Sequence, residues 1–240
     1  MISSSDINPS EKVCTYYDKV FKLFIVQHPL RARMCGFGEK DKRPIDPPPV
    51  IQLKVYDTQG KSINLTHSEI SSMVIYASLW SEDGLHKRDI VIDPSSIPIP
   101  NSSYYKNNTY ILSLEAPKKM QNLIGTTASS SFYLLDHNEN AGIFFIFNDL
   151  SVRTEGKFTL KFSFINLEGC YNNNGETSII TEVTSDIFEV YPAKKFPGMT
   201  SSTALSKAFS EQGIRIPIRI RPRVKTKTQN ITVKNENDDQ

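Results

Sequence analysis

An alternation of apolar and polar residues with a period of two is the strongest constraint on the fold. It is clearest over residues 158–164, FTLKFSF, where every second residue is Phe or Leu and the residues between are Thr, Lys and Ser. This pattern predicts a half-buried antiparallel strand. Comparable runs occur at residues 21–25, 51–55, 75–79, 110–114, 143–147 and 187–191. Because each strand must bury one face, seven or more short strands predict an all-β fold in which two sheets form a sandwich.

Two short helices are expected beside the strands. The first spans residues 117–125, beginning with a proline that suits the first turn and ending at a glycine. In the second, Leu205 and Phe209 are four residues apart and share a face, and Gly213 closes the helix.

Residues 214–221 alternate isoleucine with arginine or proline. Pro217 has no N–H to donate, so this run predicts an edge strand. Its arginines either keep the edge from pairing with other chains, or form a second cationic face or a nuclear import signal. The sequence leaves these alternatives open.

The 240 residues, of which 38% are hydrophobic, suffice for one main domain with frayed ends. We expect a flexible N-terminus over residues 1–18, a single domain over 19–222, and a polar tail over 223–240 that is too poor in apolar residues to pack. Neither an apolar signal segment nor a membrane-spanning run is recognisable. The three cysteines include no CxxC pair, which argues against a disulfide framework or a zinc site and favours the nucleus or cytoplasm.

A basic segment lies between two strand-like runs, where we expect a loop punctuated by glycine and proline. It holds five cations: Arg31, Arg33, Lys40, Lys42 and Arg43. Over residues 31–43, five cations against two acids leave a local charge of +3, whereas the whole chain carries only +2. Any polyanion would therefore be met by a patch, and this loop is the leading candidate for holding phosphates.

Motifs of enzymes are missing or incomplete. The glycine pair at 36–38 lacks the third glycine of a dinucleotide fingerprint, and neither a phosphate loop nor a GxSxG elbow occurs. The four histidines lack metal-ligand spacing, and the acids at 82–83 and 136–139 suit solvated turns. Cys35 could be activated by nearby cations, but a buried structural cysteine is the commoner case. We expect no enzymatic activity, no cofactor and no bound metal.

Several longer motifs carry a resemblance to a known family. They are RARMCGFGEKDKRPIDPPP at 31–49, SLWSEDG at 78–84, APKKMQNLIGTTASSSF at 116–132, NDLSVRTEGKFTLKFSF at 148–164 and YPAKKFPGMTSSTALSKAFSEQGIRIPIR at 191–219. With these motifs the chain resembles fungal velvet-domain regulators, and within that family the VelB type, over roughly residues 21–219. Relatives of that type often carry a long insertion after the second motif, whereas in this chain the segment after that motif is short.

The resemblance implies a Rel-like, immunoglobulin-type β-sandwich that binds double-stranded DNA. It also implies a homodimer, or a heterodimer with another velvet protein, that controls transcription in fungal development, sporulation and secondary metabolism. The family's DNA-contacting element corresponds to Lys40, Lys42 and Arg43, with Arg31 and Arg33 as a weaker extension. The alternative is an adaptor subunit that dimerises with a velvet partner and contributes little DNA affinity.

Three further features have open interpretations. The triple proline at 47–49 suits a stiff exit into the next strand better than a ligand for an SH3-type partner. Arg153 is expected in a tight turn with a local ion pair rather than on DNA. The pair Lys194 and Lys195 could extend the basic surface or could simply be solvated.

Overall fold

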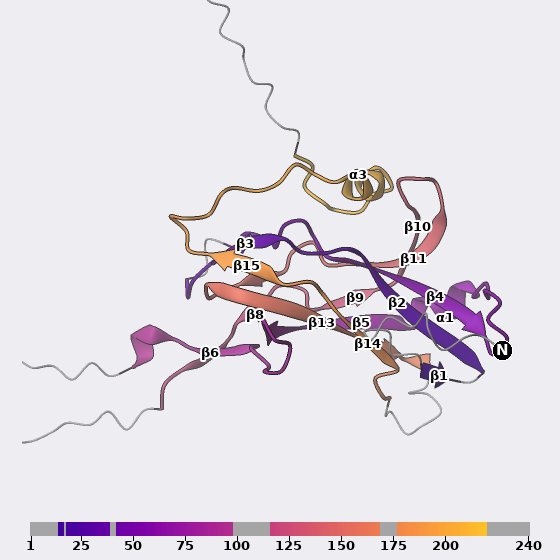
Figure 1. Cartoon of the computed structure of the whole chain (residues 1–240), viewed down its shortest axis with the longest axis horizontal. Coiled ribbons are helices and arrows are strands. Elements are labelled where there is room, and N and C mark those ends of the chain that lie inside the picture. The colour runs from indigo at the N-terminus through magenta and orange to yellow at the C-terminus, as the bar shows by residue number, and fades with distance from the viewer. Residues whose placement is uncertain (1–13, 17, 39–41, 98–115, 169–176, 220–240) are drawn as a thin grey trace, which may run out of the picture.

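A computed structural model describes residues 14–16, 18–38, 42–97, 116–168 and 177–219, and within them the chain forms two principal β-sheets (Figure 1). The predicted strand at 110–114 and most of both predicted flexible termini lie outside these residues. The five-stranded sheet has the order β1-β2-β4-β11-β10. Its strands are β1 (Cys14–Tyr16), β2 (Lys19–Gln27), β4 (Val50–Asp57), β11 (Ala141–Ile146) and β10 (Phe132–Leu135).

The six-stranded sheet has the order β3-β15-β13-β5-β9, and β14 pairs with β13 beside that path. Its strands are β3 (Arg31–Arg33), β15 (Phe188–Tyr191), β13 (Gly156–Asn166), β5 (Met73–Ser81), β9 (Ala128–Ser130) and β14 (Thr181–Thr184). Two small ribbons complete the described β structure: β6 (Ile90–Ile92) with β7 (Lys119–Gln121), and β8 (Leu123–Ile124) with β12 (Ser151–Val152). The all-β fold predicted from the alternating runs is confirmed.

Aromatic side chains join the two sheets. The central strand β13 has an apolar residue at every second position, and its Phe162 and Phe164 are fully buried. The ring centroid of Phe164 lies 5.3 Å from that of Phe21 on β2, and the centroid of Phe162 lies 5.1 Å from that of Phe147 after β11. The alternation thus places one face of each strand in a shared core, as period-two patterning requires.

Helix α3 (Ala204–Glu211) covers the outer side of the five-stranded sheet (Figure 1). Its Phe209 is fully buried, with its ring centroid 4.9 Å from that of Phe144 on β11. The Thr203 hydroxyl accepts a hydrogen bond from the Ser206 amide at the N-terminus, and Gly213 follows the helix with a φ of +94°. This confirms the helix predicted from Leu205, Phe209 and Gly213.

The helix predicted over residues 117–125 is wrong, because that segment forms β7 and β8. Each of these strands takes its hydrogen bonds from a partner distant in the sequence, and such pairing overrides local helix propensity. The sequence pattern also gave no prediction of the helix α1 (His67–Ser71), although Thr66 and Glu69 form the capping box that begins it.

The edge strand predicted over residues 214–221 is also wrong in its described part, since residues 214–219 form no strand. Ile216 instead packs with Phe209 and Phe144 in a second apolar cluster. Arg219 turns toward Asp46, at the end of the basic segment. The alternating side chains are therefore used for packing against α3 and for an ion pair, and not for pairing in a ladder.

Candidate nucleic-acid interface

Arg31 and Arg33 lie on strand β3 at the edge of the six-stranded sheet, and not in a loop as expected. β3 runs parallel to β15, with Arg31 opposite Glu189 and Arg33 opposite Tyr191. Ala32 between them is fully buried, so the two arginines occupy the outer face of the sheet and are half-buried. The segment forms a strand because it pairs with residues more than 150 positions later, which local sequence does not reveal.

Glu189 and Tyr191 determine the charge that this outer face carries beside the arginines. A hydrogen bond to Glu189, together with desolvation, raises the pKa of the Tyr191 phenol, and the charge of Arg31 acts in the opposite direction. Tyr191 is therefore neutral at physiological pH. The Glu189 carboxylate hydrogen-bonds to this phenol and belongs to the residue paired with Arg31 in the strand register, so its negative charge offsets part of the positive charge on this face.

After β3 the chain enters a segment that we name the basic loop, residues 34–45. Its first end is fixed by backbone hydrogen bonds: the Cys35 amide donates to the Val152 carbonyl and the Gly36 amide to the Arg153 carbonyl, both at 3.0 Å. The Cys35 thiol is buried and also donates to the Val152 carbonyl, at 3.3 Å. This cysteine therefore has a structural role, as its commoner interpretation predicted.

The second end of the basic loop returns to the same place. The Ser151 hydroxyl donates to the Arg43 carbonyl at 2.8 Å, and the Ile45 amide donates to the Leu150 carbonyl at 2.7 Å. Residues 150–153 thus hold both ends of the loop and form its fixed base. A surface loop whose two ends lie close together has this arrangement.

Arg153 supports the base of the loop from inside. Its side chain is 5% exposed, and it donates from Nε to the Gln121 carbonyl at 2.9 Å and from Nη1 to the Gly36 carbonyl at 3.0 Å. The expectation of a tight turn with a local ion pair did not anticipate this role. Nothing in the sequence around Arg153 marks it as buried, since the two carbonyls that it binds come from other segments.

Two cations of the loop itself, Lys42 and Arg43, are exposed. Lys40, the third residue of the predicted DNA-contacting element, lies outside the described residues. The structure thus places Lys42 and Arg43 at the surface and Arg31 and Arg33 on the adjoining strand. All four lie in the loop that this base holds or on the strand directly before it, and they can present positive charge at one end of the sandwich.

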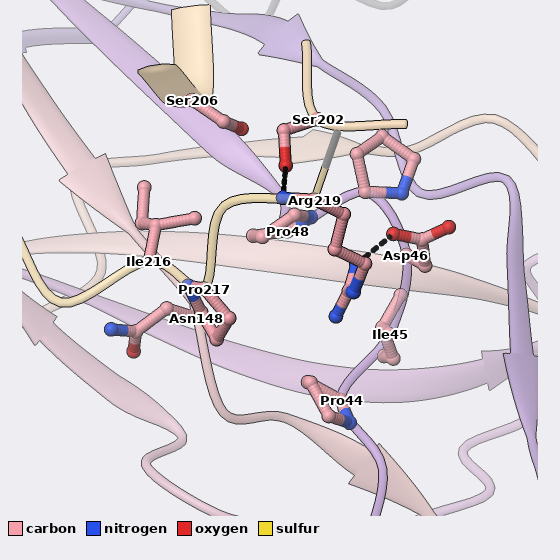
Figure 2. Close-up of a pocket in the computed structure, with 11 residues that line it drawn as sticks. Pro44, Ile45, Asp46, Pro48, Asn148, Ser202, Ser206, Ile216, Pro217 and Arg219 are labelled. Carbon is pink, nitrogen blue, oxygen red and sulfur yellow. Dashed lines mark hydrogen bonds and ion pairs between the residues drawn. The ribbon is translucent and has the colours of Figure 1, made fainter. Parts of the chain in front are cut away.

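Asp46 fixes the segment that follows the loop (Figure 2). Its carboxylate is 2% exposed and accepts hydrogen bonds from the Thr200 amide and, at 3.0 Å, from Nη1 of Arg219. Its backbone exchanges two hydrogen bonds with that of Arg31, at 2.9 and 2.8 Å. Residues 47–49, the triple proline, are buried, which agrees with a stiffening role and not with an exposed ligand.

The cavity beside Asp46 has a volume of about 10 Å³, which is room for no more than one water molecule. The described residues contain no group of three or more His, Cys, Asp and Glu side chains that could hold a metal ion. In the same part of the chain, no helix is long and apolar enough to cross a membrane.

Comparison with known proteins identifies the family. The family model for the velvet factor matches residues 21–222. The B-type member of the velvet complex from Emericella nidulans is 32% identical over 308 aligned residues, which cover 91% of this chain and 84% of that protein. The corresponding protein of Aspergillus flavus is 33% identical, with 90% and 82% covered, and velvet complex subunit 2 of Hypocrea jecorina is 32% identical, with 90% and 66% covered. An aligned stretch of 308 residues exceeds the 240 of this chain, so the Emericella relative carries insertions. The chain belongs to the velvet family.

Proposed function

We propose that this protein is a non-enzymatic transcription regulator that binds double-stranded DNA through the basic loop and acts as a dimer. The observation that carries the proposal is the position of Lys42 and Arg43, which are exposed on a loop held at both ends by residues 150–153. Because this base is already fixed in the free protein, little conformational entropy is lost when the cations meet a ligand.

Double-stranded DNA suits this surface for physical reasons. A sandwich can lay an end loop along a duplex without inserting a helix, and lysine then holds phosphates while the arginine fork can also read guanine edges. If all five cations of the segment met phosphates, the slope of log affinity against log salt would be roughly −4.5, at about 0.9 per phosphate. Binding by one protomer would be weak at physiological salt.

Dimerisation would raise this affinity, because the second protomer binds at a high effective concentration once the first is in place. The relatives are named as subunits of a velvet complex, which supports an association with a velvet protein or with a second copy of this chain. By the same analogy we propose that the protein acts in the nucleus and cytoplasm and controls development and secondary metabolism.

A second candidate is an adaptor that pairs with a velvet partner and supplies little DNA affinity of its own. The relatives' names favour it as much as the first candidate, since one member of a complex need not bind DNA itself. The two candidates differ in what the basic loop does. In the adaptor, loss of the loop cations would leave association with the partner and the DNA affinity of the complex unchanged.

The experiment is fluorescence anisotropy of the purified protein with labelled random and promoter-derived duplexes at two salt concentrations. Lys42→Ala/Arg43→Ala is the test variant, and Lys61→Ala/Lys207→Ala, which removes the same charge at two exposed lysines elsewhere, is the control. We expect salt-dependent binding that only the test variant loses, with dimerisation by analytical ultracentrifugation unchanged. Equal binding by the wild type and the test variant would favour the adaptor.

A further inference from the structure

The parallel pairing of β3 with β15 has a geometric consequence at one end of the six-stranded sheet. In an antiparallel pair, the segments that follow the two strands leave at opposite ends, whereas in a parallel pair they leave at the same end. β3 and β15 are parallel neighbours, so the basic loop after β3 and the turn after β15 leave the sheet side by side (Figure 1). Neighbouring strands lie about 4.8 Å apart.

A hydrogen bond joins the two segments at the point where they leave the sheet. The Met34 amide, the first of the basic loop, donates to the carbonyl of Tyr191, the last residue of β15, at 2.9 Å. The parallel pairing therefore extends to the start of the loop. The residues that directly follow Tyr191 begin next to the fixed base that residues 150–153 provide for the basic loop.

The turn after β15 is a defined structure. The Lys195 amide donates to the Pro192 carbonyl at 3.0 Å, which closes the turn. On either side of it, the rings of Tyr191 and Phe196 pack with their centroids 6.4 Å apart. The hydrogen bond and the packed rings fix the backbone that carries the two lysines, so less conformational freedom is left to lose when they meet a ligand.

The charges of both lysines of this turn can reach a ligand from solvent. Lys194 and Lys195 are exposed, and within the described part of the chain neither makes an ion pair with an acidic side chain. The acid nearest along the chain, Glu189, hydrogen-bonds to the Tyr191 phenol and faces Arg31 across the pair of strands. The two charges of the turn are thus not neutralised by the sheet from which it emerges.

We propose that Lys194 and Lys195 form a second phosphate-binding element, which contacts the DNA backbone beside the basic loop. The inference rests on the proposed function, because it extends the same surface. An ammonium group is a compact point charge without the planar fork that reads base edges, so the element contributes affinity and orientation but no sequence preference. Base reading, where it occurs, is left to the arginine of the basic loop.

The test uses the full chain and the anisotropy assay described above, with Lys194→Ala/Lys195→Ala, the charge-retaining Lys194→Arg/Lys195→Arg, and the control Lys61→Ala/Lys207→Ala. For the alanine pair we expect affinity to fall by about tenfold and the salt slope to flatten by about 1.8, or roughly 0.9 per phosphate. The fall should be equal for random and promoter-derived duplexes. The arginine pair should retain most of the affinity, and the control should leave the slope unchanged.

The outcomes separate this inference from the proposed function. If the wild type binds DNA and Lys42→Ala/Arg43→Ala abolishes binding, but the alanine pair at 194–195 leaves affinity and slope intact, only the second element is refuted. If the alanine pair changes the preference between duplexes, its role as a contact to phosphates alone is refuted. If the wild type binds no duplex at either salt concentration, both proposals fail. Thermal melting of each variant confirms that the exposed substitutions leave the fold intact.

Discussion

Replacing Arg219 should cost more stability than an exposed arginine normally would. The Asp46 carboxylate is 2% exposed and has two donors, the Thr200 amide and the Arg219 guanidinium, whereas the Arg219 side chain itself is 33% exposed. In Arg219→Ala the buried carboxylate loses its cation and keeps one donor. Removing one partner of a buried ion pair costs about 3–5 kcal/mol. Because water reaches the arginine side of this pair, we expect the lower end, about 3 kcal/mol.

A second substitution tests the reason for this loss. If the cost arises from a buried negative charge without its partner, then Asp46→Asn in the Arg219→Ala background should recover about 1–2 kcal/mol, because a neutral amide is cheaper to bury. In the wild-type background the same Asp46→Asn substitution should destabilise the protein, since it breaks the intact pair. The change in unfolding free energy caused by Asp46→Asn should thus be positive in the Arg219→Ala background and negative in the wild-type background.

Urea unfolding of the four proteins, monitored by tryptophan fluorescence, measures the two effects. The free energies are comparable where the slope with denaturant is the same in all four. The fluorophore is Trp80, the single tryptophan, which lies on β5 and away from the substitutions. A double variant that is no more stable than Arg219→Ala would refute the reasoning, as would a loss below about 1 kcal/mol for Arg219→Ala, the range of an exposed pair.

Two further predictions concern local features. Lys19 and the Thr66 cap lower the pKa of Glu69 from 4.5 to about 2, so the stability that this carboxylate gives the fold is complete above pH 4.5 and is lost as the pH falls through about 2. Glu69→Gln should therefore lower the free energy of unfolding in urea by about 1 kcal/mol at pH 7 and by almost nothing at pH 2. A loss that does not depend on pH would contradict this. Gly125 has a φ of +103°, and an added Cβ would lie 2.4 Å from the Asp149 carbonyl oxygen, so Gly125→Ala should lower stability by more than about 2 kcal/mol. Gly60→Ala, at a φ of +84° in open space, is its control and should cost about 1 kcal/mol; equal losses would show that the close contact has no effect.

The sequence predicted those parts of the fold that depend on local pattern. β13 was predictable because its inward phenylalanines repeat over many residues, and α3 because Phe209 and Gly213 mark its face and its end. β7 and β8 were not, because strands of three and two residues exist only through partners distant in the chain.

The candidate site, too, has features that the sequence predicted and features that it could not predict. Composition identified the basic segment, and the structure places Lys42 and Arg43 at its surface. The buried position of Arg153 and the parallel pairing of β3 could not be predicted, since both depend on backbone carbonyls and amides that every residue type carries. Such contacts leave no signature in the side-chain sequence.

The fixed base of the basic loop also bears on how this protein could be altered. Backbone atoms alone make three of the contacts between residues 150–153 and the two ends of the loop, and the Arg153 guanidinium, the Ser151 hydroxyl and the Cys35 thiol make further ones. The side chains at its exposed positions can then change without removing the contacts that hold the loop in place. If the loop binds DNA as we propose, transplanting it into another velvet protein should transfer a DNA preference while the recipient keeps its own core and its own stability.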